Sequence, residues 1–343
     1  MAGPGRRNPL IGWTLDRQSI VNVGHDLQRP ECILAESDGT LWAADARGGV
    51  MRIDPSGRQT LISQSVDSHF DVASDAAGSL LRGTLPNGLA FAENGDILIA
   101  NFGTDLLEVT TRAGVTRLLH REIDGLPMGK VNFVLRDSRN RIWITISTRV
   151  NPWSDAIRSG LADGYIALLD ERGLRVVADG LSFTNEIRLD AAEAHLYVAE
   201  TTGKRVRRFR VREDGTLIDQ GLHGPKSLGT GFIDGIAFDA YGNLWCTMIQ
   251  SERLIAITPE GEVLTLLDDG NPQAVAQLES EFQSGRPVRF ETMLACAGSI
   301  APWLASITFG GNDLRTVYLG SLRGTTIPSF RSPVAGLPMV HWK

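Results

Sequence analysis

The sequence is poor in the features that mark several common classes of protein. Its three cysteines, Cys32, Cys246 and Cys296, are too few and too scattered for a disulfide framework, and no CxxC pair starts a metal–thiolate cluster. No uninterrupted apolar run reaches the roughly eighteen residues that a membrane span needs, so we expect no membrane partner. A net charge of −6 argues against the basic field that a nucleic-acid partner requires.

The first residues, MAGPGRRNPLIGW, contain a basic pair but lack the apolar run of a secretory signal. Together with the low cysteine content, this predicts a cytoplasmic protein. Hydrophobic residues make up 42% of the chain and charged residues 22%, which is ordinary for a globular protein and excludes disorder as the dominant state.

Glycine is abundant, with 37 residues, and it punctuates a repeated pattern. Each repeat has a short apolar run, a turn rich in Asp, Asn and Gly, and a second apolar run, which is the pattern of a β-hairpin. Most repeats continue into a further strand and turn, so the unit is a small antiparallel sheet of about four strands. The six repeats begin at Pro30, Pro86, Val131, Thr184, Ile233 and Leu304.

A single sheet of this kind has two faces to bury and cannot cover both alone. Radial stacking of six sheets around an axis buries both faces, so the repeats predict an all-β protein, a six-bladed β-propeller with four-stranded antiparallel blades. An immunoglobulin-type sandwich is the alternative, but it does not repeat one hairpin six times. We expect residues 1–27 to form a leader that packs on the propeller of residues 28–343. An insertion around 268–303, in which AVAQLESEF predicts a short helix, is expected to be a lid or an oligomer contact.

The repeats also agree in register. In each repeat we count back ten residues from the residue that opens the second strand, and eleven in the fourth repeat because its turn has one extra residue. In five repeats the count ends on a side chain that bears an oxygen. Equivalent positions in equivalent blades lie at one height and point in one direction, so these side chains should converge on the axis. They are Glu31, Asn87, Asn132, Asn185 and Asp234, and in the sixth repeat the count falls near Ser306 or Ile307.

Each of these residues has an ordinary explanation when taken alone, as a turn residue or a backbone cap. Their common register favours a joint role. A ring with two carboxylates and no counter-ion would repel itself in a partly desolvated place, and a divalent cation removes that repulsion. Oxygen-only ligands predict one axial metal site, for Ca²⁺ first, with Mg²⁺, Mn²⁺ or Zn²⁺ as alternatives. None of the six histidines falls in this register.

Over residues 28 to 330 the sequence resembles the senescence-marker-protein (regucalcin)/gluconolactonase/luciferin-regenerating-enzyme family of six-bladed propellers. The motifs that carry the resemblance are RPE, LPNGLAF, KVNFVLRD, GLSFTNEIRL with LYVAET, FIDGIAFDAYGNLW and TFGGNDLRTVYLGS. The resemblance implies that Glu31, Asn132, Asn185 and Asp234 bind one divalent ion, and it leaves Asn87 as a second-sphere or substrate contact. Where the family usually has Glu-Gly-Pro, Asn-Asp and Asn-Gly, this chain has bulkier residues after Glu31, Asn132 and Asn185, which predicts a reshaped mouth.

The resemblance also implies chemistry for a small-molecule substrate. The ion would polarise an ester carbonyl and activate water, with Asp234 as the base. Lys130 lies two residues before Asn132 on the same strand face and can meet a substrate oxygen, or else is a solvated lysine at a blade edge. Arg149 and Trp153, on an expected mouth loop, can recognise a carboxylate or a ring, or else are packing residues.

The sequence therefore predicts a metal-dependent hydrolase that opens a sugar lactone or a similar cyclic ester. Two alternatives remain open. One is an organophosphate hydrolase of the diisopropyl-fluorophosphatase type, which uses the same ligand set, and the other is a non-catalytic calcium-binding propeller. A strictosidine-synthase-like lineage is a further candidate, although those relatives do not need the full ring of ligands.

Overall fold

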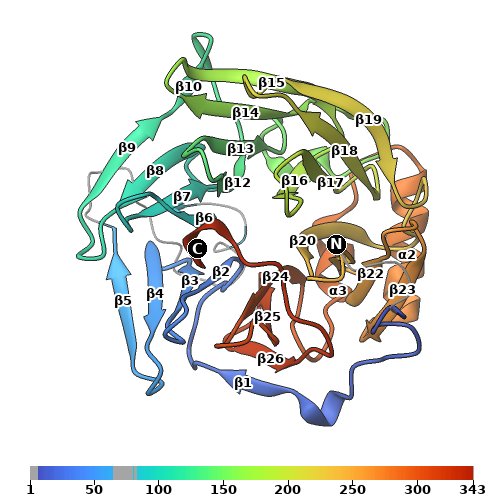
Figure 1. Cartoon of the computed structure of the whole chain (residues 1–343). Helices are drawn as coiled ribbons and strands as arrows, with labels where there is room; N and C mark the ends of the chain where they lie inside the picture. Colours follow the sequence, from blue (N-terminus) through green and yellow to red (C-terminus); the bar gives the residue numbers. More distant parts are fainter. Residues whose placement is uncertain (1–6, 65–79, 81–82, 343) are drawn as a thin grey trace.

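The computed structural model describes residues 7–64, 80 and 83–342. Their strands form six four-stranded sheets arranged radially around one axis (Figure 1). Within each sheet every neighbouring pair of strands is antiparallel, as between β12 (Val131–Arg136) and β13 (Ile142–Ile146). The predicted six-bladed propeller is confirmed.

Five blades use strands that are consecutive in the chain, so each blade is a meander built from one sequence repeat. These are β2 (Ile33–Ala35), β3 (Leu41–Asp45), β4 (Gly49–Ile53) and β5 (Gln59–Ser63); β6 (Pro86–Phe91), β7 (Ile97–Asn101), β8 (Leu106–Thr110) and β9 (Thr116–His120); β12 and β13 with β14 (Gly164–Asp170) and β15 (Gly173–Leu181); β16 (Thr184–Leu189), β17 (His195–Glu200), β18 (Arg205–Val211) and β19 (Leu217–His223); and β20 (Phe232–Phe238), β21 (Leu244–Ile249), β22 (Arg253–Ile257) and β23 (Val263–Asp268). A small hairpin, β10 (Glu122–Ile123) and β11 (Leu126–Pro127), projects between the second and third blades.

The sixth blade joins the two ends of the described chain. Its inner strands are β24 (Leu304–Gly310), β25 (Thr316–Ser321) and β26 (Ile327–Arg331), and its outer strand is β1 (Val21–Val23), which pairs antiparallel with β26. The leader predicted for residues 1–27 thus contributes a strand, and Leu10 and Leu15 pack in the apolar cluster of the fifth and sixth blades. Residues 1–6 of that leader lie outside the described part.

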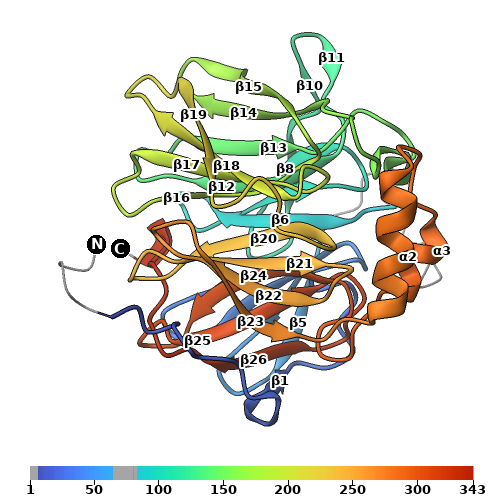
Figure 2. The same cartoon turned by 90° about the vertical axis from the view of Figure 1, so that its right-hand side faces the viewer.

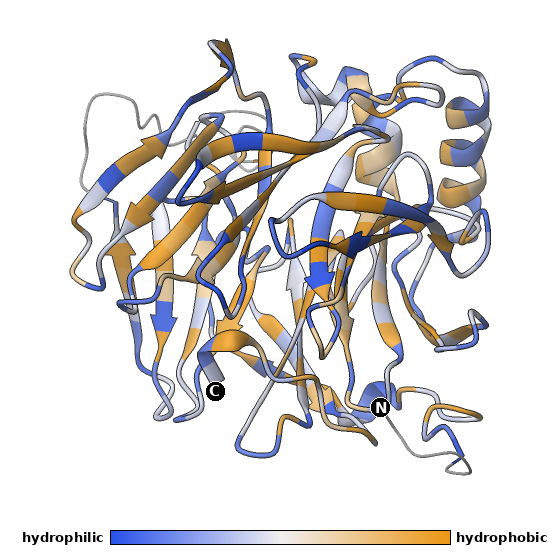
Figure 3. Cartoon of the chain, turned by 45° about the horizontal axis from the view of Figure 1, so that its top comes forward, coloured by the Kyte–Doolittle hydropathy of each residue, from blue (hydrophilic) through white to orange (hydrophobic). Residues whose placement is uncertain are grey.

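Apolar residues concentrate along the strands and hydrophilic residues in the turns (Figure 3). Three blades also share a hydrogen bond that closes the first hairpin, in which a tryptophan of the second strand donates its indole N–H to a carboxylate in the preceding turn. The pairs are Trp42–Glu36 at 2.6 Å, Trp143–Asp137 at 2.9 Å and Trp245–Asp239 at 2.9 Å. Each bond satisfies a buried indole and fixes the register of the hairpin.

The insertion around 268–303 contains two helices, α2 (Pro272–Gln283) and α3 (Phe290–Ala295), and α2 covers the predicted helical segment AVAQLESEF. Both helices lie on one face of the propeller, and the two termini lie on the opposite face (Figure 2). The helices pack through Leu278, Phe282 and Met293 onto loops at the mouth of the channel. Among the described residues, no helix is long and apolar enough to cross a membrane.

One buried histidine leads to a prediction of how the stability of the fold changes at acidic pH. His223, at the end of β19, packs edge-on against Tyr197, and burial lowers the pKa of His223 to about 4, with the Arg208 charge adding to the effect. Between pH 6.5 and 4 the unfolded chain therefore binds more protons than the folded one, so stability should fall as the pH drops through this window, by about 3 kcal/mol at most.

His223→Phe keeps the ring and removes the titrating group, so urea unfolding of this variant should lose less stability than the wild type between pH 6.5 and 4. An equal loss in both proteins would show that other groups dominate the acid response.

Candidate metal centre

The innermost strand of each blade brings its first residues to the axis, and in five blades the pairing of this strand with its neighbour is interrupted at that point. The register shifts lie between Pro86 and Leu89, Val131 and Phe133, Thr184 and Ile187, Ile233 and Ile236, and Leu304 and Ile307. Irregularities of this kind bend a strand locally and re-aim a side chain. Asn87, Asn132, Asn185 and Asp234 all lie within these interruptions, and Glu31 lies two residues before β2.

Two glycines that follow these residues are required by packing. A Cβ atom on Gly88 would lie 2.5 Å from the Cα atom of Phe133 in the next inner strand, and one on Gly235 would lie 2.5 Å from the carbonyl oxygen of Ala305. The pairs Asn87-Gly88 and Asp234-Gly235 are therefore not turns. They lie inside β6 and β20, where neighbouring blades approach closely.

The five side chains predicted from the register line one cavity at the hub. Their residues are buried, with exposed fractions between 1% for Glu31 and 5% for Asp234. We call Glu31, Asn87, Asn132, Asn185 and Asp234 the polar floor of this cavity. The enclosed volume of the cavity is about 60 Å³, enough for an ion and a few water molecules, and together with its open mouth the empty space is about 590 Å³.

Three oxygens of the polar floor find no hydrogen-bond donor among the residues that the structure describes. They are Oε2 of Glu31 and the Oδ1 atoms of Asn132 and Asn185. A buried acceptor without a partner costs free energy, and hard oxygens that share a cavity with the Asp234 carboxylate are the donor set that Ca²⁺ prefers. The polar floor thus fits a hard divalent cation. The described residues contain no group of three or more His, Cys, Asp or Glu side chains placed to hold a metal ion, so such a cation would depend on the amide oxygens.

Asn87 differs from the other two asparagines because its amide is engaged. Its Oδ1 accepts a hydrogen bond from Nη2 of Arg29 at 2.6 Å, and its Nδ2 donates to Oε1 of Glu31 at 3.2 Å and to the carbonyl oxygen of Asn132 at 3.0 Å. Asn87 therefore orients Glu31, which leaves Oε2 of that carboxylate free to face the cavity.

Burial governs the charges of the polar floor. It raises the pKa of Asp234 to about 7, with the Glu186 carboxylate adding to the rise and Asn185 and Arg29 opposing it. It also raises the pKa of Glu31 well above the usual range, and the nearby Asp234 adds to that effect. A cation bound between the two groups would stabilise both carboxylates and reverse these shifts.

Arg29 is a functional candidate that sequence reasoning missed. The residue is buried, and its Nη1 donates to the carbonyl oxygen of Pro86 at 3.0 Å. Within the described part of the chain its Nε has no hydrogen-bond partner. Burial lowers the pKa of Arg29, while Glu31 and Asp234 oppose this. The one sequence feature that pointed to Arg29 is its position directly before Pro30-Glu31. A basic residue beside a metal ligand is not expected, so this feature did not identify it.

The remaining predicted residues lie at different distances from the cavity. Trp153, in the short helix η2 (Trp153–Ala156), lines it. Lys130 does not: its Nζ lies 2.9 Å from Oδ1 of Asp105 and 5.7 Å from the centre of the Phe102 ring, which does line the cavity. Arg149 is exposed and lies over the ring of Tyr165, at 4.4 Å, so the structure does not bring it to the cavity.

Above the polar floor the cavity is lined by apolar side chains, which we call the apolar wall. Periodicity did not predict this wall because most of its members come from loops and from the insertion. Its members are Leu80, Phe102, Trp153, Ile157, Phe183, Phe232, Ile249, Met293, Trp303 and Leu322.

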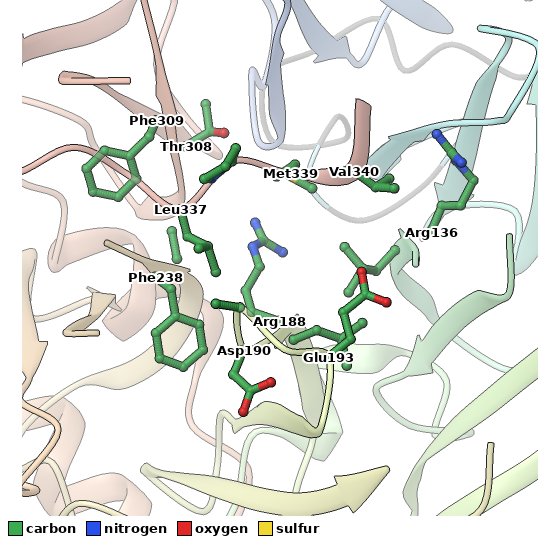
Figure 4. A pocket seen from close by; sticks show the side chains of 15 residues that line it. Arg136, Arg188, Asp190, Glu193, Phe238, Thr308, Phe309, Leu337, Met339 and Val340 are labelled. Atoms are coloured by element: carbon green, nitrogen blue, oxygen red, sulfur yellow. The ribbon is translucent and has the colours of Figure 1, made fainter. Parts of the chain in front are cut away.

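A second cavity lies at the other end of the channel, where residues 337–340 of the C-terminal segment contribute to it (Figure 4). The Arg188 side chain lines this cavity, and its Nη2 pairs with Oε2 of Glu186 at 2.9 Å. The other oxygen of Glu186 accepts a hydrogen bond from Ser306 of β24. The buried Glu186–Arg188 pair thus separates the two cavities along the axis.

Comparison with known proteins agrees with this architecture. Residues 63–274 match the family described as the SMP-30/Gluconolactonase/LRE-like region. The chain belongs to this family. The matched residues include four members of the polar floor, and Glu31 lies before them.

Among curated members and relatives, the chain is 28% identical over 173 residues to the 6-deoxy-6-sulfogluconolactonase of Pseudomonas putida, an alignment covering 50% of this chain and 48% of that protein. It is 25% identical over 248 residues to the protein strictosidine synthase-like 6 of Arabidopsis thaliana, covering 70% of this chain and 62% of that protein. The chain thus spans about half to two thirds of the length of these relatives.

Solved structures share the fold. A luciferin-regenerating enzyme superposes with a TM-score of 0.67 at 16% identity, covering 94% of this chain and 98% of that one. A calcium-binding regucalcin from Agrobacterium tumefaciens superposes with a TM-score of 0.65 at 16% identity, covering 94% and 97%. At these identities the likeness concerns the fold.

Metal binding at the polar floor can be tested by thermal unfolding in the presence of Ca²⁺. An ion that binds only the folded chain adds about 2.7 kcal/mol of stability at one hundred times its Kd, so Ca²⁺ should raise the Tm of the wild type. Glu31→Gln removes a charged ligand and should abolish most of this increase.

Glu252→Gln is the matched control, because Glu252 is as buried as Glu31 but does not line the cavity. This variant should keep the response to Ca²⁺. An unchanged Ca²⁺ response in Glu31→Gln would place the ion elsewhere.

Proposed function

We propose that this protein is a metal-dependent hydrolase that opens a lactone or a similar cyclic ester, with Ca²⁺ as the first candidate for the ion. The observation that carries the proposal is the set of three buried, unpartnered oxygens on Glu31, Asn132 and Asn185, which line one cavity together with Asp234. Membership of the SMP-30/gluconolactonase/LRE-like family supports lactone hydrolysis in general.

Glu31, Asn132, Asn185 and Asp234 would hold the ion, and the ion would supply polarisation of the ester carbonyl and activation of water. The chain supplies a rigid geometry for this chemistry. Asn132, Asn185 and Asp234 sit at the start of inner strands. Glu31 lies just before β2, and Asn87 holds it in place through a hydrogen bond of 3.2 Å. A fixed ligand set reduces the reorganisation that the reaction would otherwise require.

Asp234 is the proposed general base. Burial gives its carboxyl group a pKa of about 7, and a cation bound nearby would lower that pKa, so the group would be ionised at neutral pH and able to accept a proton. Arg29 adds a positive charge next to both carboxylates, with an unpartnered Nε donor. This donor suits an oxygen that gains negative charge during ester cleavage.

The cytoplasmic location predicted from the sequence remains part of this proposal. It is supported by the state of Cys32, Cys246 and Cys296, which are all free and buried.

The direct test of the proposal is lactone hydrolysis measured with and without a chelator. Removal of the ion should abolish activity, and Asp234→Asn should lower kcat by about 100-fold or more because it removes the base and the negative charge of one ligand. Glu252→Gln should retain activity.

A chelated wild type that opens lactones at the full rate would contradict the proposal. Hydrolysis of phosphotriesters in place of lactones would favour the organophosphate hydrolase, and tight Ca²⁺ binding with no hydrolysis of any ester would favour the calcium-binding propeller.

A second test concerns Lys130, which does not line the cavity but lies beside the Phe102 ring that does, and which we propose as a residue that meets a substrate oxygen at the mouth. Lys130→Ala should then raise KM about 10-fold or more, since it removes a charged hydrogen bond. Asp105→Ala, which releases the ammonium group from its ion pair, should not raise KM. If the two variants behave alike, the pair stabilises the mouth and Lys130 does not contact the substrate.

A further inference from the structure

The cavity above the proposed metal site is built from two chemically different halves. The polar floor lies at the axis, and the ten side chains of the apolar wall stand above it. Five of these ten are aromatic, namely Phe102, Trp153, Phe183, Phe232 and Trp303. A pocket of this composition favours a ligand with one polar reacting group and an apolar body.

The polar atoms on the wall are turned away from the cavity or already bonded. The indole N–H of Trp153 donates to the carbonyl oxygen of Leu80 at 3.3 Å, and that of Trp303 donates to the carbonyl oxygen of Met293 at 3.0 Å. Thr201 donates its hydroxyl to the carbonyl oxygen of Ile233 at 2.8 Å and accepts from Asn185 at 3.1 Å. Among the described lining residues, Gln250 is the one polar side chain besides these and the residues around the metal site.

The insertion supplies and supports part of this wall. Met293 belongs to α3, and Trp303 follows at the end of the insertion. Both are almost fully buried in a cluster with Leu278 and Phe282 of α2. A Lys204–Glu279 ion pair at 2.5 Å anchors α2 to the fourth blade. The insertion therefore holds an apolar surface against the mouth in a fixed position.

We propose that the site accepts lactones or esters with an alkyl or aryl substituent and discriminates against polyhydroxylated sugar lactones. The inference rests on the proposed hydrolase function and specifies its substrate class. The hydroxyl groups of a sugar lactone would lose water on entering the cavity without finding partners on the wall, whereas each methylene of an alkyl chain gains from burial there.

Three lactones with the same six-membered ring test this preference: δ-valerolactone, δ-nonalactone, which adds a butyl group, and D-glucono-δ-lactone, which adds hydroxyl groups. With Ca²⁺ present, kcat/KM should rise about 10-fold or more from δ-valerolactone to δ-nonalactone. It should be lowest for D-glucono-δ-lactone. Faster opening of D-glucono-δ-lactone than of δ-nonalactone would overturn the inference while leaving the proposed function intact.

Two variants of the fifth blade make a matched pair. Ile249 lines the cavity and Ile255 is buried in the blade core, so isoleucine-to-threonine substitution at each site introduces the same hydroxyl in different places. Ile249→Thr should reduce the ratio of kcat/KM values for δ-nonalactone and δ-valerolactone several-fold. Ile255→Thr should lower the Tm but leave the ratio unchanged. An equal change of the ratio in both variants would count against the wall as the origin of the preference.

A binding measurement separates this inference from the hydrolase proposal. The ketone 3-butylcyclohexanone has a methylene group in place of the ring oxygen of δ-nonalactone, so it keeps the ring, the carbonyl and the position of the butyl group but has no ester bond. Calorimetric titration should show that it binds about 10-fold or more tightly than cyclohexanone, even to a protein that hydrolyses no ester. Equal affinities for the two ketones would refute the apolar preference, while a preference for the alkyl ketone without any lactone hydrolysis would refute only the proposed function.

Discussion

The structure depends on the burial of like charges at the point where six sheets meet. Glu31, Glu186 and Asp234 are all buried around the axis, and the positive groups nearest to them are Arg29 and Arg188. The charges of Glu186 and Arg188 cancel within their ion pair. The two carboxylates of Glu31 and Asp234 then face one guanidinium group, that of Arg29. The remaining negative charge and the unpartnered amide oxygens account for both the raised pKa values and the fit to a divalent cation.

This electrostatic arrangement follows from the packing of the blades. The inner strands start at the axis, and interruptions of their pairing turn the side chains at the second or third residue toward the hub. Gly88 and Gly235 allow neighbouring inner strands to approach within contact distance there, so the side chains before them cannot be displaced outward. The same packing places loops and the α2–α3 insertion over one mouth, where apolar side chains line the approach to the polar floor. A low-dielectric wall strengthens the interactions of charged groups beneath it.

Much of the fold and of the polar floor was predictable from the sequence, because both are periodic. Six hairpins with a common register predict six blades, and a side chain at a fixed position before each hairpin turn must repeat its place around the axis. The sixth repeat is the exception, because the count ended near Ser306 or Ile307, whereas the strand pairing places Ala305 at the position equivalent to Asp234. The helix α2 also followed from local pattern.

The other features were not predictable because they arise from tertiary contacts. The engagement of Asn87 by Arg29, the ion pair between Lys130 and Asp105, and the displacement of Arg149 onto Tyr165 all depend on loop conformation. The apolar wall combines residues from several loops with Met293 and Trp303 of the insertion, and these share no spacing in the sequence. The proposed substrate preference rests on this part of the molecule, where a single sequence carries the weakest signal.

The central claim is that a divalent ion neutralises the hub. It is tested most directly by a crystal structure of the protein grown with Mn²⁺ or Ca²⁺, with anomalous scattering used to locate the ion. The account predicts one anomalous peak on the propeller axis, within ligand distance of oxygens from Glu31, Asn132, Asn185 and Asp234. A hub filled only by water or by the Arg29 side chain, or a peak located away from these four residues, would contradict it.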